Sequence, residues 1–308
     1  MPERNILAAK RDALELRSRV IERIRSHFRR AGFLEVQTPL LTPAPAPELN
    51  IEAVPAGDGF FLATSPELYM KRLLAAGYGK LFQLTPVFRS GERGRLHHPE
   101  FTLLEWYRTG ASYKDMQRDC VELLHEVCAF GAATGGGACR GSVIEPGKPW
   151  ESLTVRDAFL RLAGWDPVVD FDPDRFDVDL VTKVEPYLGF PNPCFLEDYP
   201  PERAALARLK DSAPPVAERF ELYWAGIELA NGFTELTDPA EQRKRFEAVL
   251  ADRHEAGLSS RPMPEAFLAA IEHLPQCAGI ALGLDRLVML LAGADSVDRV
   301  VAFPPDLL

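Results

Sequence analysis

The chain has few cysteines and no long apolar run. Its 308 residues include five cysteines, which are odd in number and scattered, and no Cys-x-x-Cys pair occurs. This pattern argues against a disulfide framework or a zinc site and favours a reducing compartment. No apolar stretch approaches the length of a membrane span, and the polar residues 1–5 lack the core of a signal peptide. We therefore expect a cytoplasmic protein with no membrane partner.

Two common nucleotide-binding loops are also absent, and positive charge is not in excess. The sequence contains no Gly-x-x-x-x-Gly-Lys-Ser/Thr loop and no Gly-x-Gly-x-x-Gly after a strand, so neither a P-loop nor a Rossmann site is indicated. The formal net charge is -10. An acidic chain has no global field that attracts nucleic acid, so a large RNA-binding surface is disfavoured, and with it tRNA as a partner, although a local basic patch remains open.

Hydrophobic periodicity indicates a mixture of helices and strands. Val20, Ile21, Ile24 and Phe28 recur at helical spacing and predict an amphipathic helix. The order of elements predicts a single α+β domain over 1–308, built on an antiparallel sheet flanked by helices. The expected helices span 11–30, 65–76, 113–130 and 241–253, and the expected strands span 33–39, 81–88, 101–108, 218–224 and 227–230. Residues 279–291 predict a short strand turning into a helix, 131–138 a surface loop, and 152–215 mainly helices within an insertion spanning about 112–215.

The strand expected over 101–108 has an unusual face. With a period of two, Phe101, Leu103, Glu105 and Tyr107 share one side of it. A carboxylate between aromatic side chains is costly in an apolar core because it has no partner there. We therefore expect this face to line a pocket that receives a cation.

Two further carboxylates, Glu67 and Glu235, are candidates for the same pocket. Several carboxylates and the Tyr107 phenol suit a diamine such as lysine, because buried ammonium and carboxylate groups each compensate the other. Such a site rejects an apolar analogue strongly, since its own polar groups would be left unpaired. The alternative for Glu67 is a first-turn helix residue favoured by the helix dipole.

The expected hairpin turning at 225–226 brings two more carboxylates together. A two-residue turn places Tyr223 opposite Glu228, with Glu221 as the diagonal neighbour on the same face. Two such carboxylates suit Mg²⁺, which takes one or two carboxylates together with phosphate oxygens. The alternative is that both face solvent or pair with nearby arginines.

Arg89 and Arg286 are candidate phosphate ligands, because guanidinium binds phosphate oxygens in a bidentate manner. Nearby glycines at 91, 94, 279 and 283 allow a nucleotide to approach the backbone closely. An ordinary surface loop would also account for an arginine beside glycines.

Together these segments resemble the catalytic domain of class II aminoacyl-tRNA synthetases of the lysyl type. Residues 11–39 resemble motif 1, the dimer-forming element; Phe88 to Tyr107 resembles motif 2, and Gly283-Leu284-Asp285-Arg286 resembles motif 3. Residues 64–73 and 226–236 resemble the lysyl-specific parts. The match follows the family order over nearly the whole chain.

Within that group the chain is most similar to the lysyl-tRNA synthetase paralogues that modify elongation factor P. Motif 1 begins almost at the first residue, so no anticodon-binding domain is expected before it. Motif 2 ends in Trp106-Tyr107-Arg108, as in the paralogues. Ala281 stands where lysyl-tRNA synthetases usually have glycine, and its methyl would reshape the pocket in favour of (R)-β-lysine over α-lysine.

The resemblance implies the reaction and its partners. It implies ATP and Mg²⁺ as cofactors, activation of (R)-β-lysine or α-lysine as an adenylate, transfer to a lysine of elongation factor P, and a homodimer. The enzyme alternative is a truncated lysyl-tRNA synthetase that charges tRNA. A non-catalytic, synthetase-like regulatory subunit is disfavoured because Arg89 and Arg286 are both retained.

The resemblance also implies a role for each site residue. Arg89 and Arg286 would hold the ATP phosphates as the catalytic pair, and Phe101 would stack on adenine. Glu67 would bind the backbone-side amine of the substrate, and Glu105, Tyr107 and Glu235 would bind the ε-ammonium. The acid of motif 2 stands one place later than usual, with Gly91 in its position and Glu92 next, and His98 replaces a common Asn. The implied ATP contacts are Arg89, Ser90, Gly91, Glu92, His97, His98, Phe101, Glu228, Leu229, Gly283 and Arg286; the substrate contacts are Ser65, Pro66, Glu67, Glu105, Tyr107, Asn231, Glu235 and Ala281; and the Mg²⁺ ligands are Glu221 and Glu228.

Overall fold

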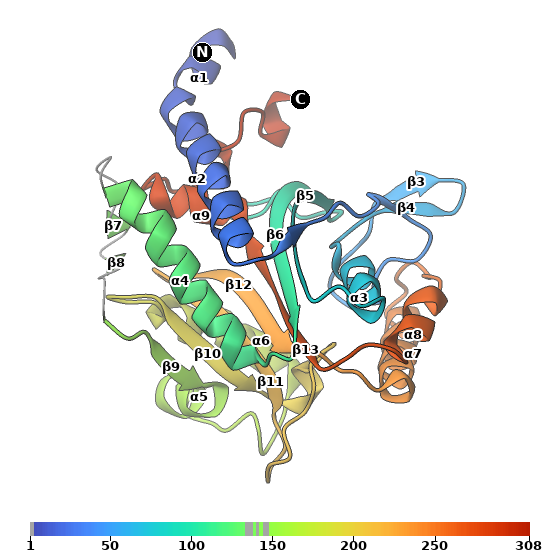
Figure 1. Ribbon diagram of the computed structural model, residues 1–308. Coiled ribbons are helices and arrows are strands. Elements are labelled where there is room, and N and C mark those ends of the chain that lie inside the picture. The colour runs from blue at the N-terminus through green and yellow to red at the C-terminus, as the bar shows by residue number, and fades with distance from the viewer. Residues whose placement is uncertain (1–2, 133–137, 140–141, 144–147) are drawn as a thin grey trace.

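An eight-stranded sheet forms the centre of the protein (Figure 1). The computed structural model describes residues 3–132, 138–139, 142–143 and 148–308. The strand order is β1-β5-β6-β13-β12-β11-β10-β9, and the pairs β1–β5 and β9–β10 are parallel while the others are antiparallel. The strands are β1 (Leu34–Glu35), β5 (Lys80–Phe88), β6 (Glu100–Thr109), β9 (Glu151–Thr154), β10 (Cys194–Tyr199), β11 (Ala217–Trp224), β12 (Ile227–Thr234) and β13 (Cys277–Gly283).

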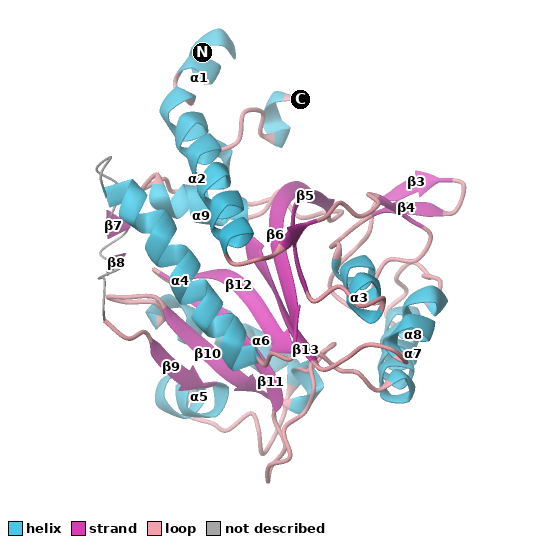
Figure 2. Cartoon of the chain, viewed as in Figure 1, coloured by secondary structure: helices cyan, strands magenta, loops and turns pink. Residues whose placement is uncertain are grey.

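Helices cover both faces of this sheet, which confirms the expected α+β class (Figure 2). On one face lie α2 (Arg11–Arg30), α4 (Tyr113–Ala132) and α9 (Leu284–Leu291). Towards the β5 edge on the other face lie α3 (Glu67–Ala75), α7 (Pro239–Glu255) and α8 (Glu265–Ile271). The remaining elements are α1 (Glu3–Ala8), α5 (Val155–Leu162), α6 (Pro173–Asp179), a three-stranded sheet of β2 (Leu41–Thr42), β4 (Phe60–Leu62) and β3 (Pro55–Gly57), the pair β7 (Ala138–Cys139) and β8 (Ser142–Val143), and short helical turns at Leu180–Val184, Glu185–Tyr187, Pro201–Arg203, Val297–Arg299 and Pro305–Leu307.

Helix α2 has the bounds and buried stripe that the periodicity predicts. Val20, Ile24 and Phe28 are buried, and the Phe28 ring stacks on Phe82 of β5 at a centroid distance of 4.9 Å. The helix ends before Gly32, whose φ of +78° favours glycine. Burial of this apolar stripe therefore fixes α2 on the sheet.

Two segments differ from the sequence-based expectation. The strand expected over 33–39 is limited to Leu34–Glu35. The segment 152–215 is mainly helices and connections as expected, but it also contains the end of β9 and the whole of β10, which extend the main sheet through the pairing of β10 with β11. The loop expected over 131–138 lies largely outside the described residues. No helix in the described part of the chain combines the length and the apolar character needed to cross a bilayer.

Candidate functional site

One face of the central strands carries the polar residues of the site. Because residues opposite one another on paired strands share a face, the register aligns Glu105 of β6 with Ala281 of β13, Asn231 of β12 and Glu221 of β11. The next row aligns Tyr107 with Gly279. The hairpin register is also as expected, with Tyr223 opposite Glu228. The sheet thus brings together carboxylates that are far apart in the sequence.

Glu105 is the centre of the acidic part of this site. Its carboxylate is 1% exposed and accepts hydrogen bonds from Ser65 Oγ and from the Tyr107 hydroxyl, each at 2.7 Å. Burial, together with the nearby Glu67 carboxylate, raises the pKa of Glu105 to about 7. Burial and the Glu105 carboxylate also hold the pKa of Tyr107 well above its usual value. The phenol therefore stays protonated and donates a hydrogen bond to Glu105. A carboxylate in this environment gains strongly from an incoming ammonium group.

Glu67 and Glu235 lie beside Glu105, and both pair with Lys71 of α3. Lys71 Nζ donates to Glu67 Oε1 at 2.5 Å and forms an ion pair with Glu235. Glu235 is 1% exposed, and its Oε1 has no hydrogen-bond partner among the described residues. Burial raises the pKa of Glu235, and the Lys71 ammonium opposes this rise. An unpartnered buried carboxylate oxygen is a ready acceptor for a substrate ammonium.

Pro66 and Gly279 shape the same pocket. Pro66 precedes α3, and Glu67 lies in the first turn of this helix. Glu67 is therefore both a first-turn residue favoured by the helix dipole and a residue of the pocket. At Gly279 a Cβ atom would lie 2.1 Å from the Tyr107 ring and 2.8 Å from Glu235 Oε1. Only glycine leaves room for those two side chains.

A cavity of about 290 Å³ opens next to the acidic pocket. Arg89 lies in it with its guanidinium 5.1 Å from the centre of the Phe101 ring, and its Nη1 is 3.8 Å from Glu92 Oε1. The displaced acid of motif 2 therefore faces the same cavity. Site residues that line this cavity are Arg89, Glu92, His97, His98, Phe101, Glu228, Leu229, Asn231, Ala281, Gly283 and Arg286, whereas Ser90 and Gly91 lie in the loop beside it and do not line it.

Arg286 of α9 is held by acceptors on two sides. Its Nη1 donates to the backbone oxygen of Glu228 at 2.7 Å and contacts Glu228 Oε2 at 3.2 Å. Its Nε donates to the Leu96 oxygen at 3.3 Å, and its Nη2 lies 2.6 Å from His97 Nε2. Burial and the Arg286 charge lower the pKa of His97, so its ring stays neutral and accepts. The guanidinium is thus fixed in the cavity with its charge only partly compensated.

The three motif segments are joined by Asp285, a residue whose role the sequence did not suggest. Its carboxylate pairs with Arg17 of α2 and accepts from the Thr102 backbone N–H at 2.9 Å. Arg17 Nη2 also donates to Thr102 Oγ1 at 2.9 Å. These contacts tie α2, β6 and α9 together at the wall of the cavity, which Asp285 also lines. The signal available in the sequence was that Asp285 directly precedes the phosphate-binding candidate Arg286.

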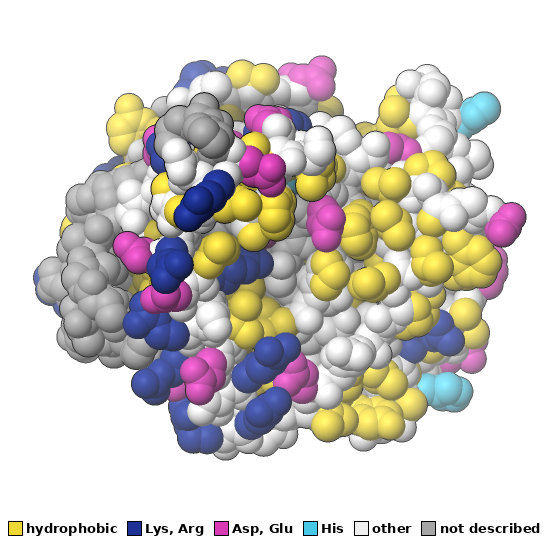
Figure 3. All heavy atoms as spheres, turned by 90° about the horizontal axis from the view of Figure 1, so that it is seen from above, with side chains coloured by type: hydrophobic (Ala, Val, Ile, Leu, Met, Phe, Trp, Pro, Cys, Tyr) yellow, Lys and Arg dark blue, Asp and Glu magenta, His cyan; other side chains and the backbone are white. Residues whose placement is uncertain are grey.

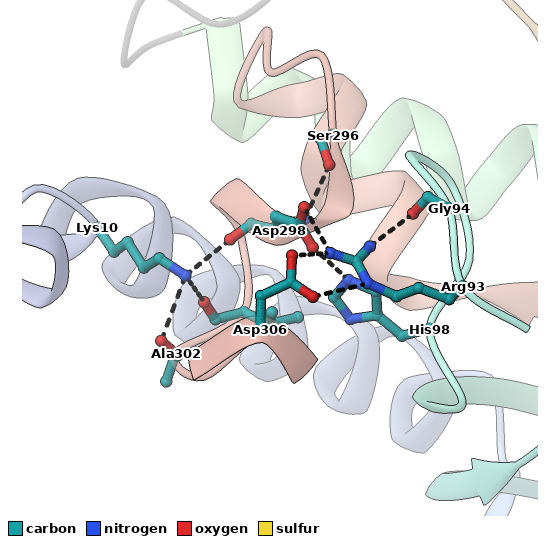
Figure 4. A network of polar contacts seen from close by, with 9 residues as sticks. Lys10, Arg93, Gly94, His98, Ser296, Asp298, Ala302 and Asp306 are labelled. Atoms are coloured by element: carbon teal, nitrogen blue, oxygen red, sulfur yellow. Dashed lines mark hydrogen bonds and ion pairs between the residues drawn. The ribbon is translucent and has the colours of Figure 1, made fainter. Parts of the chain in front are cut away.

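A second polar network holds the motif 2 loop against the C-terminal segment (Figure 4). Asp298 Oδ1 lies 2.6 Å from His98 Nε2, and Arg93 Nη2 donates to Asp306 at 2.7 Å. Lys10 Nζ donates to backbone oxygens of the same segment, among them Asp298 O at 2.7 Å. His98 lines the cavity but directs this nitrogen to Asp298, so the structure gives it a structural partner in addition to the expected nucleotide contact.

Glu221 and Glu228, the expected Mg²⁺ ligands, lie on the same sheet face. Glu228 lines the cavity, whereas Glu221 accepts hydrogen bonds from Arg219 Nη2 and the Tyr223 hydroxyl, each at 2.7 Å. Burial raises the pKa of Glu221, although the Arg219 charge opposes this, and the Glu228 carboxylate raises it further. Both carboxylates pair with an arginine, Glu221 with Arg219 and Glu228 with Arg286, as the alternative expected, yet they lie close enough to repel each other, which suits a divalent cation. No group of three or more acidic, His or Cys side chains suited to a metal occurs among the described residues, so phosphate oxygens would have to complete the shell.

Fold and site together define a class of protein. The family of class II tRNA synthetases (D, K and N) matches residues 7–307, and the chain belongs to this family. The chain is 38% identical to the elongation factor P–(R)-β-lysine ligase of Vibrio cholerae serotype O1, with 94% of each chain covered. It is 39% identical to the ligase of the same name from Vibrio parahaemolyticus serotype O3:K6, with 95% of each covered, and 38% identical to that of Proteus mirabilis, with 94% of this chain and 93% of the relative covered. The protein is accordingly a ligase built on a synthetase catalytic domain.

Proposed function

We propose that this protein activates (R)-β-lysine with ATP and transfers it to a lysine side chain of elongation factor P. Similarity to ligases of that name over almost the whole chain supports this proposal. The observation that carries it is the acidic pocket, in which Glu105 and Glu235 are buried beside Tyr107 and adjoin the cavity that holds Arg89 and Arg286. Such a pocket suits a diamino acid, and such a cavity suits a nucleotide.

In the first step a carboxylate oxygen of the amino acid attacks the α-phosphorus of ATP, and pyrophosphate leaves. Arg89 and Arg286 would stabilise the charge that develops on the phosphate oxygens, since both side chains lie in the cavity before the substrate arrives. Glu221 and Glu228 would hold Mg²⁺, which when bound would neutralise phosphate charge. No protein nucleophile is required.

In the second step the ε-amine of a protein lysine attacks the acyl carbon of the adenylate. AMP leaves, the amine gives up a proton, and an amide bond forms. In the acidic pocket, Glu67 would bind the substrate amine that lies near the substrate carboxylate. Glu105, Tyr107 and Glu235 would bind the distant ammonium of the substrate. Ala281 lies between the strand positions of Glu105 and Asn231 and lines the cavity, and a methyl group at this position would favour the β-isomer.

The proposal extends to the setting of the enzyme. The cysteines whose side chains are described, Cys120, Cys128, Cys194 and Cys277, are free and buried, which supports a cytoplasmic location. A homodimer is supported by exposed apolar side chains after α2, where Leu34 is 51% and Leu41 is 50% exposed. Figure 3 shows apolar side chains gathered on the side of the molecule that holds β3 and β4.

The test has two assays. ATP–pyrophosphate exchange with (R)-β-lysine and with α-lysine should show lysine-dependent activity that is higher with the β-isomer. Purified elongation factor P should then gain the mass of one lysyl group only when ATP, the amino acid and this protein are all present. Adenylate formation without this transfer, or efficient charging of tRNA instead, would contradict the proposal.

A further inference from the structure

Lys71 is a buried cation inside the acidic pocket. It lies on α3, is 2% exposed, and its ammonium group contacts Glu67 on one side and Glu235 on the other. The aromatic rings of Phe233 and Phe267 lie 5.1 and 5.9 Å from Nζ. These surroundings shield the lysine from solvent and keep its charge within the pocket.

The charges in this pocket match those of a diamino acid. Three carboxylates, on Glu67, Glu105 and Glu235, and one ammonium, on Lys71, leave two negative charges when all four groups are ionised. A lysine isomer with both amines protonated brings two positive charges. Without the Lys71 ammonium the pocket would carry three negative charges, and at least one carboxyl would take up a proton, because adjacent buried like charges are not stable.

We infer that Lys71 is a positioning residue that acts as a permanent counter-cation to Glu67 and Glu235, holding both carboxylates in place, and so sets the selectivity of the pocket for a diamino acid. This inference rests on the proposed function, because it concerns the same amino-acid site. Lys71 itself takes no part in the chemistry.

The ionisation of the surrounding groups supports this role. Burial alone would lower the pKa of Lys71, but Glu235 and Glu67 outweigh it and raise the pKa, so the ammonium is retained at any working pH. Besides these two carboxylates, the titratable groups that face the pair are Glu105, Tyr107 and Cys277. All three become more negative when they ionise, so none replaces the cation.

A different role for Lys71 would be purely structural, as a link between α3 and β12. Loss of a purely structural link would lower stability and overall activity. It would not change the KM for lysine while leaving the KM for ATP unchanged. A counter-cation, in contrast, should affect the KM for lysine and its pH dependence while leaving the KM for ATP nearly unchanged.

The experiment measures ATP–pyrophosphate exchange for the parent, Lys71→Met and Lys71→Ala. We expect kcat/KM for lysine to fall about 100-fold in Lys71→Met, mainly through KM, as for a buried charge pair that loses one partner. In the pH profile of kcat/KM for lysine, the acid limb should move to higher pH in Lys71→Met, because Glu235 loses the charge that opposes the rise of its pKa. Ethylammonium should restore activity at least about tenfold in Lys71→Ala, where the cation can occupy the vacated space, but not in Lys71→Met, where the side chain fills it.

Lys183→Met is the matched control. Lys183 also pairs with a carboxylate four residues away, Asp179, but its side chain is 49% exposed, so its loss should leave the KM for lysine unchanged. An unchanged lysine KM in Lys71→Met, or the absence of amine rescue in Lys71→Ala, would overturn the inference. Lysine-dependent activity of the parent would still support the proposed function in that case. A parent protein without lysine-dependent exchange would refute the proposed function and this inference together.

Discussion

Replacing Glu105 with glutamine should make the empty protein more stable and the enzyme far less active. Glutamine has nearly the same shape; its amide oxygen can accept from one of the two hydroxyls, Ser65 or Tyr107, that donate to the native carboxylate at 2.7 Å, and its NH₂ group can donate to the other. The substitution therefore removes one charge and reverses one hydrogen bond. Its effects report what that charge costs in the free protein and what it contributes when the substrate binds.

The expected gain in stability follows from the pKa of Glu105, which rises from 4.5 to about 7 on folding, mainly through burial. A carboxyl whose pKa is raised on folding contributes stability below its unfolded pKa and loses it as the pH rises through its folded pKa. With about 1.4 kcal/mol per unit of pKa, the loss approaches roughly 3 kcal/mol at pH 8. Glu105→Gln escapes this loss, so its advantage should be near zero at pH 4.5 and about 3 kcal/mol at pH 8.

The expected loss of activity follows from the same charge. Removing one partner of a buried, hydrogen-bonded ion pair costs about 2–5 kcal/mol. This cost corresponds to a decrease of roughly 30- to 4,000-fold in kcat/KM for lysine, with little change in the KM for ATP. Urea unfolding at pH 5 and pH 8 measures the first effect, and ATP–pyrophosphate exchange measures the second. A variant that is less stable than the parent at pH 8, or that uses lysine within threefold of the parent, would refute the reasoning.

Three more outcomes test the site. Gly279→Ala should lower kcat/KM for lysine at least about 100-fold and destabilise the fold by about 1–3 kcal/mol, since its Cβ would lie 2.1 Å from the Tyr107 ring. Thermal unfolding and ATP–pyrophosphate exchange measure the two effects. Gly79→Ala is the control, because its Cβ would meet only Thr109 Oγ1, at 3.8 Å. Arg286→Lys should raise the KM for ATP about 10- to 100-fold, because one ammonium cannot keep the contacts with Glu228, Leu96 and His97; an unchanged ATP titration would contradict this. The KM for lysine should fall about tenfold from pH 6 to pH 8 at saturating ATP, because Glu105, with a pKa of about 7, must ionise to bind an ammonium; the change should be smaller in Glu105→Gln, and a flat profile in the parent would exclude this account.

The parts of the fold that follow local rules could be predicted from the sequence. Alternation placed Glu105 and Tyr107 on one face of β6, and the two-residue turn placed Tyr223 opposite Glu228; both are confirmed. The strands β9 and β10 were missed, because a parallel pair joins residues that are far apart in the chain, such as Glu151 and Cys194. No local pattern specifies that pairing, and short apolar runs between prolines do not distinguish a strand from a helix.

The counter-cation could not be predicted for a related reason, although part of its signal was visible. Glu67 and Lys71 are four residues apart on an expected helix, a spacing that usually indicates a solvent-exposed pair worth a few tenths of a kcal/mol. The pair acquires a different meaning because the sheet brings Glu235 to the same ammonium and buries Lys71 and Glu235, while Glu67 is only partly exposed. Once the pair is buried, its electrostatic cost must be balanced within the pocket, and the remaining negative charge becomes a property of the substrate site. A Glu–Lys pair that includes a predicted pocket carboxylate should therefore be treated as part of the binding site whenever the fold buries that carboxylate.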